Sequence, residues 1–259
     1  MDNDMHFIEN GKEGSSMLNN IDINQMNRLM EENEDAKQII TQLLKNYHAS
    51  VSMIAHEIRN PLTLVASALQ VMEVQHPEVK DFSSWKQTMD DVSFMCGLLN
   101  DLTDYNNGHT LHYSVFQIER LIRNVAVSFA LSLDADGSEI EFSSQIIPGM
   151  GDFTGDKIKL EQVILNLLRN AREAVSEHGI IFLRAERIAD DIVIECTDNG
   201  CGISEDILDQ IFEPFFSRKE NGTGLGLSVA KQIVTAHGGT ISAGCSADGR
   251  TVFTVTLPV

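Results

Sequence analysis

Apolar residues recur every three or four positions along the first part of the chain, a spacing that predicts two amphipathic helices. The first is predicted from about Asp22 to about Gln75, where His76-Pro77 ends it. Its seam has coiled-coil spacing and consists of Ile40, Leu44, Tyr47, Val51, Ile54, Ile58, Leu62, Val65, Leu69 and Met72. The second helix ends at Asn106-Asn107-Gly108. Its stripe is Trp85, Met89, Val92, Cys96, Leu99 and Leu102.

Two such helices cannot bury both stripes alone, so we expect a helical hairpin that dimerises into a four-helix bundle. Beyond Gly108 the pattern alternates between strands and helices, as in a mixed α/β domain. Strands are predicted at 111–116, 139–146, 180–187, 192–197, 240–244 and 252–257, and helices at 118–133, 156–178 and 225–237. Residues 1–21 are polar, and we expect a disordered segment or tether there.

Composition narrows the classes of partner. The net charge of −19 argues against nucleic acid, because phosphate backbones require clustered Lys and Arg. No apolar run approaches the roughly 20 residues that cross a bilayer, and the acidic N-terminus has no apolar segment like that of a secretory signal. Four scattered cysteines, Cys96, Cys196, Cys201 and Cys245, indicate free thiols rather than a metal site. We therefore expect a cytoplasmic protein without a membrane span.

His56 lies on the first predicted helix but off its seam. It is two residues from both Ile54 and Ile58, so at about 100° per residue it points toward water. Pro61 cannot donate to the carbonyl of Glu57, which loosens the helix next to the histidine. A neutral imidazole, with a pKa of about 6.5, is a competent nucleophile near neutral pH. By itself this pattern also fits an ordinary surface histidine beside a kink.

Two motifs in the second half suit a nucleotide. Asn166 and Asn170 are four residues apart, so both amides share one helix face, and an asparagine oxygen suits Mg²⁺ that also binds phosphates. Asp198-Asn199-Gly200-Cys201-Gly202 follows a predicted strand, where a carboxylate can accept a hydrogen bond from an amine such as that of adenine. Gly200 and Gly202 permit close approach of the ligand. The paired asparagines could also be the solvent-exposed face of a helix, and the segment from Asp198 to Gly202 could be an ordinary tight turn.

Two further motifs lie next to each other. Gly222-Thr223-Gly224-Leu225-Gly226 opens the last predicted helix, whose free N–H groups favour phosphate. It does not follow a strand, so it is not a Rossmann fingerprint. The segment before it, Phe212-Glu213-Pro214-Phe215-Phe216-Ser217-Arg218-Lys219, combines aromatic residues with two cations. It is either a hinged cover that brings Arg218 or Lys219 to phosphates or a surface loop anchored by its aromatic residues.

In this order, after an exposed histidine, the motifs resemble those of two-component sensor histidine kinases over about residues 40–259. The segment from His56 to Leu62 resembles the H box and Asn166 to Asn170 the N box. Asp198 to Gly202 resembles the G1 box, Phe212 to Phe216 the F box and Gly222 to Gly226 the G2 box. The resemblance implies a dimerisation and phosphotransfer hairpin at 22–108. It implies an ATP-binding domain of the gyrase and MutL type at 109–259, an α/β sandwich with a mixed sheet and helices on one face.

The resemblance also implies the chemistry of the H box. His56 would take a phosphoryl group from Mg-ATP and pass it to an aspartate of a response regulator receiver domain. Glu57 would draw off the proton of His56 or orient its ring. Asn60 would position a water that hydrolyses phosphate from the bound partner, which is a phosphatase activity. The ATP-binding domain would have to swing to reach His56, and we predict the hinge near Asn106-Asn107-Gly108.

The roles in the nucleotide site are implied in the same way. Asn170 would hold Mg²⁺, with Asn166 nearby, and Asp198 would recognise adenine by accepting a hydrogen bond from its amine. The glycines of the G2 box would flex a lid over the triphosphate. The full set of residues expected to contact the nucleotide is Asn166, Asn170, Asp198, Gly200, Gly202, Phe212, Lys219, Gly222, Thr223, Gly224, Leu225 and Gly226. Only about 40 residues precede the resemblance, so we expect the signal to arrive through the coiled-coil extension, a separate sensory partner or a sensory part outside this sequence.

Two alternatives belong to other classes. One is a phosphotransfer or scaffold protein whose ATP domain is inert, although such relatives lack the glycine boxes that are present here. The other is an ATP-driven clamp or a serine kinase with the same ATP fold, in which His56 has no role. The acid and alkali stability of the phosphorylated product separates these alternatives from a histidine kinase.

Overall fold

A computed structural model describes residues 23–108, 110–208, 210–219, 222–246 and 248–259. The chain divides into two compact units, one that ends at Ser50 and one that begins at Val51. The tether predicted at 1–21 lies outside the described residues. The predicted domain boundary at 108/109 remains a prediction.

The first predicted helix is two helices, so this prediction is wrong at one point. α1 spans Ile23–Glu32 and α2 spans Glu34–Gln75. Between them, the side-chain oxygen of Asn33 accepts a hydrogen bond from the Ala36 N–H at 3.0 Å. Asparagine is a favoured N-cap because it satisfies an N–H that has no partner within the helix. Asn33 therefore starts a new helix where the apolar spacing alone suggests continuity.

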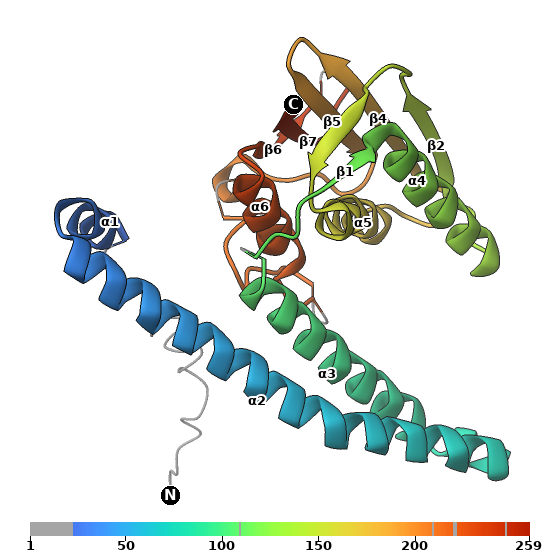
Figure 1. Cartoon of the computed structure of the whole chain (residues 1–259). Coiled ribbons are helices and arrows are strands. Elements are labelled where there is room, and N and C mark those ends of the chain that lie inside the picture. The colour runs from blue at the N-terminus through green and yellow to red at the C-terminus, as the bar shows by residue number, and fades with distance from the viewer. Residues whose placement is uncertain (1–22, 109, 209, 220–221, 247) are drawn as a thin grey trace, which may run out of the picture. The chain divides into compact units, whose positions relative to one another are not determined.

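The second unit begins within α2 and continues into a helical hairpin (Figure 1). As predicted, α2 ends before His76-Pro77, and a short 3₁₀ helix, η1 (Pro77–Asp81), leads to α3 (Trp85–Asn106). Polar contacts join the helices, and Trp85 Nε1 of α3, for example, donates to Glu73 Oε2 of α2 at 3.3 Å. Arg59 Nη2 donates to Leu99 O at 3.1 Å and to Thr103 Oγ1 at 2.8 Å, and Asn106 Nδ2 donates to Ser52 Oγ at 2.6 Å.

The predicted seam of α2 is only partly buried within one chain. Ala55 is 1% exposed and lies in the hairpin interface, although it is not a member of the predicted seam. Seam members Ile58, Val65 and Met72 are each 49% exposed. The coiled-coil spacing therefore describes a stripe that is wider than the contact with α3, and its outer edge remains accessible.

The rest of the second unit is an α/β sandwich. Its five-stranded sheet has the order β2 (Glu141–Ile146), β4 (Ile180–Ile188), β5 (Asp191–Asp198), β7 (Thr251–Pro258) and β6 (Thr240–Cys245). The β2–β4 pair is parallel and the other pairs are antiparallel, which confirms the predicted mixed sheet. A separate antiparallel pair is formed by β1 (Ser114–Gln117) and β3 (Asp152–Gly155).

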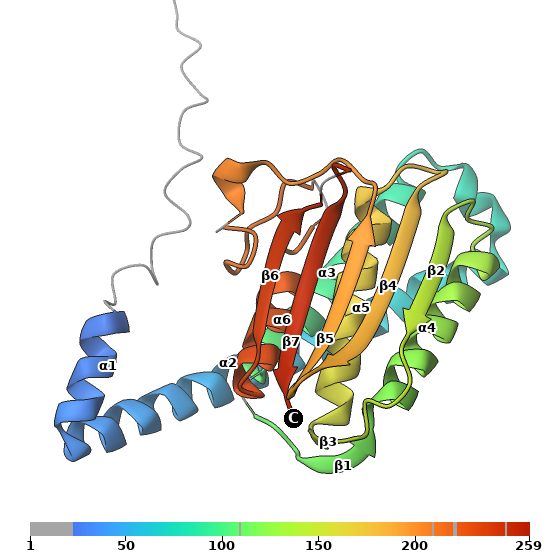
Figure 2. The same ribbon diagram turned by 90° about the horizontal axis from the view of Figure 1, so that it is seen from above.

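Three helices cover one face of the five-stranded sheet (Figure 2). They are α4 (Ile118–Ala135), α5 (Lys157–Ala174) and α6 (Gly226–Ala236), and the 3₁₀ helix η2 (Glu205–Ile207) lies in the loop region before α6. Alternate residues of β5, from Ile192 through Ile194 and Cys196 to Asp198, are buried. Because side chains alternate across a strand, Asp198 belongs to the same face as this apolar row.

Two predictions in this part need correction. The strand β3 was not predicted, because its four residues contain one large apolar side chain, Phe153, between short glycine-rich segments. The predicted helix 156–178 ends earlier, at Ala174, because Val175 adopts an extended conformation with ψ of 157°. Gly179 therefore does not end the helix; it directly precedes β4.

Candidate active site

His56 is exposed on α2, as its helical phase predicts. Asn60, one turn further on, places its Nδ2 3.4 Å from His56 Nδ1. In the described part of the chain no hydrogen-bond partner contacts Nε2 of His56. Glu57 and Asn60 are also exposed. The three predicted H-box residues therefore lie together at the surface, with one ring nitrogen paired and the other accessible.

The helix around His56 is held to α3 by a neighbouring side chain. Pro61 lies within α2, which continues without a break despite the missing N–H. The Thr63 hydroxyl donates to the Arg59 carbonyl at 2.8 Å, and the Arg59 side chain reaches α3 as described above. Arg59 Nε is buried without a hydrogen-bond partner among the described residues. The loosened backbone next to His56 is thus held to α3 by its neighbour.

The N-box residues project from α5, which begins at a strong cap. Asp156 Oδ1 accepts hydrogen bonds from the N–H groups of Ile158 and Lys159, both at 3.1 Å. Burial alone would raise the pKa of Asp156, but N–H hydrogen bonds, the first of them from the linker residue His112, outweigh it and lower the pKa. Asp156 therefore holds the start of the helix that carries Asn166 and Asn170.

The two asparagines have different partners. Asn166 Nδ2 donates to the Gly226 carbonyl at 2.9 Å, so it joins α5 to the start of α6. Asn170, one turn later, has its Oδ1 3.4 Å from Lys219 Nζ. The structure therefore brings the N box, the end of the F-box segment and the G2 box together. Of the two asparagines, Asn170 is the one whose side-chain oxygen contacts a cation, the ammonium group of Lys219.

Asp198 ends β5 with a buried carboxyl group that is 1% exposed. Its Oδ1 accepts the Gly200 N–H at 2.9 Å, whereas Oδ2 is buried without a hydrogen-bond partner among the described residues. Burial raises the pKa of Asp198, against the opposing effects of the Gly200 N–H and of the nearby Thr251 side chain. A buried acceptor without a partner is unfavourable, so this oxygen fits a donor such as the exocyclic amine of adenine.

The G1 loop lies against the end of α5. Cys201 N donates to the Ala174 carbonyl at 3.1 Å. A Cβ on Gly200 would be 2.4 Å from the same carbonyl oxygen, so only glycine fits there. This contact uses the last carbonyl of α5, and it places the accessible residues Cys201 and Gly202 at the edge of the site.

The F-box segment is anchored by its first residue and has a strained backbone at its fourth. Phe212 is 9% exposed and packs edge-on against Phe253, with ring centroids 6.3 Å apart. Phe215 has a φ of 65°, a left-handed conformation that is unfavourable for a residue with a side chain. The burial of Phe212 makes it an anchor of the segment, and its predicted contact with the nucleotide stays a prediction.

The two cations of this segment have separate partners. Arg218 lies near Asp206, with Nη2 3.8 Å from Oδ2. The Lys219 side chain reaches α5, where its Nζ is 2.6 Å from Glu173 Oε2. Of the two cations predicted near phosphates, Lys219 is therefore the one that lies beside Asn170. Glu173 was not predicted, although its position three residues after Asn170 on the same helix face is a usable signal.

The G2 box packs on the F box and leads into α6. Gly224 has a φ of 68°, and a Cβ there would be 2.5 Å from the Phe215 backbone. Leu225 is fully buried, so it anchors the box in the core and does not offer a side chain to a ligand. None of the described side chains caps the N-terminus of α6, which leaves its first N–H groups available to an anion.

Thr223 connects the G2 box to the hairpin. Its hydroxyl donates to Asp101 Oδ2 on α3 at 2.6 Å. Burial raises the pKa of Asp101, and the hydrogen bond from Thr223 opposes this effect. One turn along α3, Asp104 Oδ2 accepts from Gln162 Nε2 of α5 at 2.7 Å. Neither aspartate was predicted, since nothing in the periodicity distinguishes them from other polar positions of α3.

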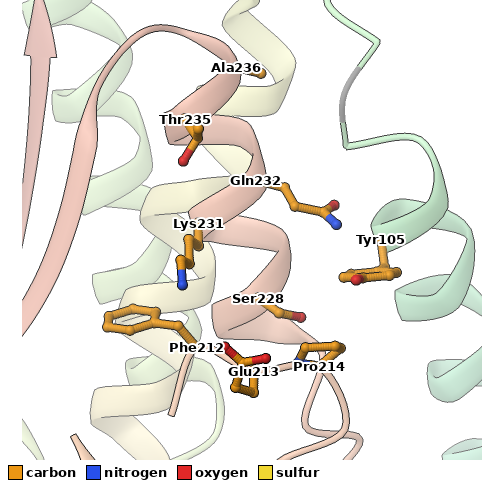
Figure 3. A pocket seen from close by; sticks show the side chains of 9 residues that line it. All are labelled: Tyr105, Phe212, Glu213, Pro214, Ser228, Lys231, Gln232, Thr235 and Ala236. Carbon is orange, nitrogen blue, oxygen red and sulfur yellow. The ribbon is translucent and has the colours of Figure 1, made fainter. Parts of the chain in front are cut away.

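A pocket of about 320 Å³ is bordered by residues of the F box, α3 and α6 (Figure 3). Its lining comprises Tyr105, Phe212, Glu213, Pro214, Ser228, Lys231, Gln232, Thr235 and Ala236. Tyr105 of α3 faces α6 across it in Figure 3. Phe212 is the only member of the predicted nucleotide set in this lining, so the pocket is separate from the group around Asn170 and Asp198.

No group of three or more His, Cys, Asp or Glu side chains among the described residues is arranged to hold a metal ion. None of the helices described here combines the length and apolar character needed to span a membrane. All four cysteines are free. Burial raises the pKa of Cys196 to about 12.

Residues 155–259 match the family described as histidine kinase-, DNA gyrase B- and HSP90-like ATPases. Over 222 residues, which are 80% of this chain and 61% of the relative, the chain is 33% identical to the sensory histidine kinase/phosphatase NtrB of Rhodobacter capsulatus. The chain spans about half the length of the first curated relatives that it matches.

Two solved structures are similar as well. The catalytic domain of histidine kinase ThkA is 30% identical, with a TM-score of 0.50, over 57% of this chain and 95% of that domain. Histidine kinase ThkA in complex with the response regulator protein TrrA has a TM-score of 0.56 and 25% identity, and the match covers 89% of this chain and 66% of that one. These similarities confirm the predicted resemblance, and the chain belongs to the sensor histidine kinase family.

Proposed function

We propose that this protein is an ATP-dependent protein histidine kinase of a two-component phosphorelay. It takes the γ-phosphoryl group of Mg-ATP onto His56 and passes it to an aspartate of a response regulator receiver domain. The observation that carries the proposal is the buried Asp198 Oδ2 at the end of β5, an acceptor without a hydrogen-bond partner among the described residues. An adenine amine satisfies this acceptor, and the uncapped start of α6 suits the phosphates of the same nucleotide.

The chain's own residues divide the work of binding. Asp198 accepts a hydrogen bond from adenine, and the N–H groups at the start of α6 bind phosphate oxygens. Asn170 holds Mg²⁺ through its amide oxygen, a ligand type that Mg²⁺ accepts beside phosphates and water. Asn166 keeps α5 joined to Gly226, so the metal ligand and the phosphate-binding turn stay in register. Bound Mg²⁺ supplies neutralisation of the charge that develops on the phosphates.

The transfer itself needs an accessible, correctly protonated ring. The bond from His56 Nε2 to the γ-phosphorus forms as the bond from that phosphorus to the bridging oxygen breaks, and ADP leaves. The ring then loses its Nδ1 proton to Glu57 or to water. In the structure the Asn60 Nδ2 adjoins Nδ1, so the Asn60 amide has to turn its oxygen to the ring before it can accept the Nδ1 proton and leave the lone pair on Nε2. Motion about the hinge at Asn106-Asn107-Gly108 brings the two reactants together.

The partners follow from exposed surfaces and from the relatives. The outer edge of the α2 stripe, with Ile58, Val65 and Met72 each 49% exposed, supports a homodimer built on the hairpin. The complex of histidine kinase ThkA with a response regulator supports a receiver domain as the second substrate. The kinase/phosphatase NtrB supports the reverse activity, in which Asn60 positions the hydrolytic water. We place the protein in the cytoplasm, where ATP and receiver domains are available.

The test is incorporation of labelled phosphate from ATP. We expect the wild-type protein to gain a label that is labile in acid and stable in alkali, as phosphohistidine is. His56→Gln should lose the label and keep its affinity for ATP, because the nucleotide residues are untouched. His178→Gln is the matched control, since this exposed histidine lies in the α/β part beside Glu139 and should label like the wild type.

Three outcomes contradict the proposal. Strong labelling of His56→Gln would remove His56 as the acceptor. An acid-stable, alkali-labile label would indicate a serine kinase. ATP binding by the wild type without any label, together with phosphate exchange with a receiver domain, would indicate a phosphotransfer scaffold with an inert ATP domain.

A further inference from the structure

Lys219 is held on α5 by a residue that has no assigned role. Its Nζ is 2.6 Å from Glu173 Oε2 and 3.4 Å from Asn170 Oδ1. Glu173 and Asn170 are three residues apart, so they lie on the same face of α5, about one turn from each other. The Lys219 ammonium group is therefore within reach of the amide oxygen that the proposed function gives to Mg²⁺.

An ammonium group and a metal ion compete for such an oxygen. Both require oxygen donors, and two cations at one amide oxygen repel each other. In this arrangement Lys219 occupies the acceptor that Mg²⁺ needs, and the Glu173 carboxylate supplies the charge that keeps it there. Lys219 lies between the F box and the G2 box in sequence. Its backbone is joined to the G2 box, because its carbonyl accepts the Gly222 N–H at 3.3 Å. A change of partner by Lys219 therefore displaces the start of the G2 box.

The contact is weak enough to be exchanged. The side chains of Lys219 and Glu173 are 41% and 58% exposed. Exposed ion pairs contribute little and are screened by salt. A triphosphate carries more negative charge than the single carboxylate of Glu173. It also places that charge closer to the start of α6. Phosphate oxygens can therefore take Lys219 from Glu173.

We propose that Glu173 is a positioning residue of the nucleotide site, which holds Lys219 on α5 until the phosphates of ATP take the lysine over. The exchange releases Asn170 for Mg²⁺ and moves the lysine-bearing segment toward the nucleotide. This inference rests on the proposed function, because it assumes that the site binds Mg-ATP. It adds a residue and a step of ligand exchange to that site.

The test is a double-mutant cycle on the affinity for Mg-ATP, measured by calorimetry with wild type, Glu173→Gln, Lys219→Met and the double variant. Glu173→Gln should bind Mg-ATP about two- to five-fold more tightly, because Lys219 no longer has to leave a carboxylate; this is ~0.4–1 kcal/mol at 1.4 kcal/mol per tenfold. Lys219→Met should bind more weakly. In that background Glu173→Gln should have no further effect, since there is no lysine to hold.

Two controls separate this role from a general effect of charge. Glu161→Gln makes the same charge change on the same helix, at an exposed position away from the site, and should leave the affinity for Mg-ATP unchanged. Adenosine lacks phosphates, so Glu173→Gln should not alter its binding, which can be followed by chemical-shift changes. A merely structural role of Glu173 would affect adenosine and ATP alike.

The outcomes are distinct. Equal tightening by Glu173→Gln with and without Lys219 would show simple relief of charge repulsion and would overturn the inference alone. Weaker Mg-ATP binding by Glu173→Gln would make Glu173 a metal ligand and would overturn it as well. A wild-type protein that binds no Mg-ATP would overturn the proposed function together with this inference.

Discussion

The helical hairpin from Val51 to Asn106 and the α/β part from Ser114 onward bury apolar surface to very different extents. In the α/β part, whole strand and helix faces are buried, and side chains such as Leu183 and Phe253 are 0% exposed. In the described hairpin the buried apolar side chains are Ala55, Val92 and Leu99. The α/β part therefore buries its apolar faces within one chain, whereas the hairpin has an apolar stripe that no described residue covers.

This difference agrees with the chemistry proposed for each part. A nucleotide site needs fixed, desolvated groups such as Asp198, and a closed core holds them in place. A phosphoacceptor must be reached by the ATP-binding domain and by a receiver domain, so His56 has to remain outside any core. The hairpin instead uses polar contacts, such as that of Arg59 with Thr103, to fix the helix that carries His56.

The largest expected effect is on the core of the α/β part. Phe253→Ala removes a fully buried ring that also packs against Phe212. We expect the free energy of unfolding of this part to fall by about 3–5 kcal/mol. The single tryptophan, Trp85, lies in α3 and reports on the hairpin. In urea, the far-ultraviolet circular dichroism transition should therefore move to lower concentration, while the tryptophan fluorescence transition stays in place.

Val127→Ala is the matched control, because Val127 is 59% exposed on α4. It should change the stability by no more than about 0.5 kcal/mol. A shift of the Trp85 transition together with the dichroism in Phe253→Ala would mean that the two parts unfold as one, and the contrast between them would be wrong.

The next effect concerns the exposed stripe of the hairpin. Val65→Glu combined with Met72→Glu places charges on the outer edge of α2, nine or more residues from His56. If these side chains are buried between two copies, the loss is at least about 3 kcal/mol, which weakens dimerisation on the order of a hundred-fold. Sedimentation at micromolar concentrations should show a dimer for the wild type and a monomer for the variant.

A second pair of substitutions tests whether the effect is local. Ile188→Glu with Val127→Glu introduces the same charges at exposed apolar positions of the α/β part, and the dimer should persist. A Val65→Glu/Met72→Glu protein that sediments as a dimer would show that the stripe is not the dimer interface.

How far the sequence could predict the fold differs between elements for physical reasons. Strand β4 was predicted to within one residue, because alternation continues along its whole length. The break at Asn33 and the early end of α5 were not predicted. Both depend on side-chain or loop contacts: Asn33 caps α2, and Cys201 of the G1 loop binds the carbonyl of Ala174. Periodicity carries no information on such contacts.

The same limit applies to the site. The motifs predicted roles for Asn170, Asp198 and Lys219, because residue type and order alone are distinctive there. They did not indicate that Lys219 pairs with Glu173 or that Thr223 binds Asp101. These pairs join residues that are 46 and 122 positions apart in sequence, and only the fold determines which side chains meet. Phe212 and Leu225 were predicted as ligand contacts for the same reason; both side chains are buried, which the motifs do not indicate, and the contacts stay predictions.

The smallest expected effect is a pH dependence that distinguishes a buried carboxyl group from an exposed one. Burial raises the pKa of Asp198 in the folded protein, so its ionisation destabilises the fold. The wild-type protein keeps the associated stability below the unfolded pKa of about 3.9 and loses it as the pH rises through the folded value. Asp198→Asn does not titrate, so its free energy of unfolding relative to the wild type should increase from about pH 4 upward and then level off.

Denaturant unfolding at several pH values measures this difference, and Asp248→Asn supplies a control of opposite sign. The hydrogen bond from Ser246 lowers the pKa of the exposed Asp248, so the wild type gains stability as the pH rises, and this variant should fall behind it. Asp101, whose pKa is also raised, is present in all three proteins and cancels in the comparison. A flat difference for Asp198→Asn would mean that its carboxylate is well solvated in the folded protein. Asp198 would then no longer be the desolvated acceptor on which adenine recognition depends.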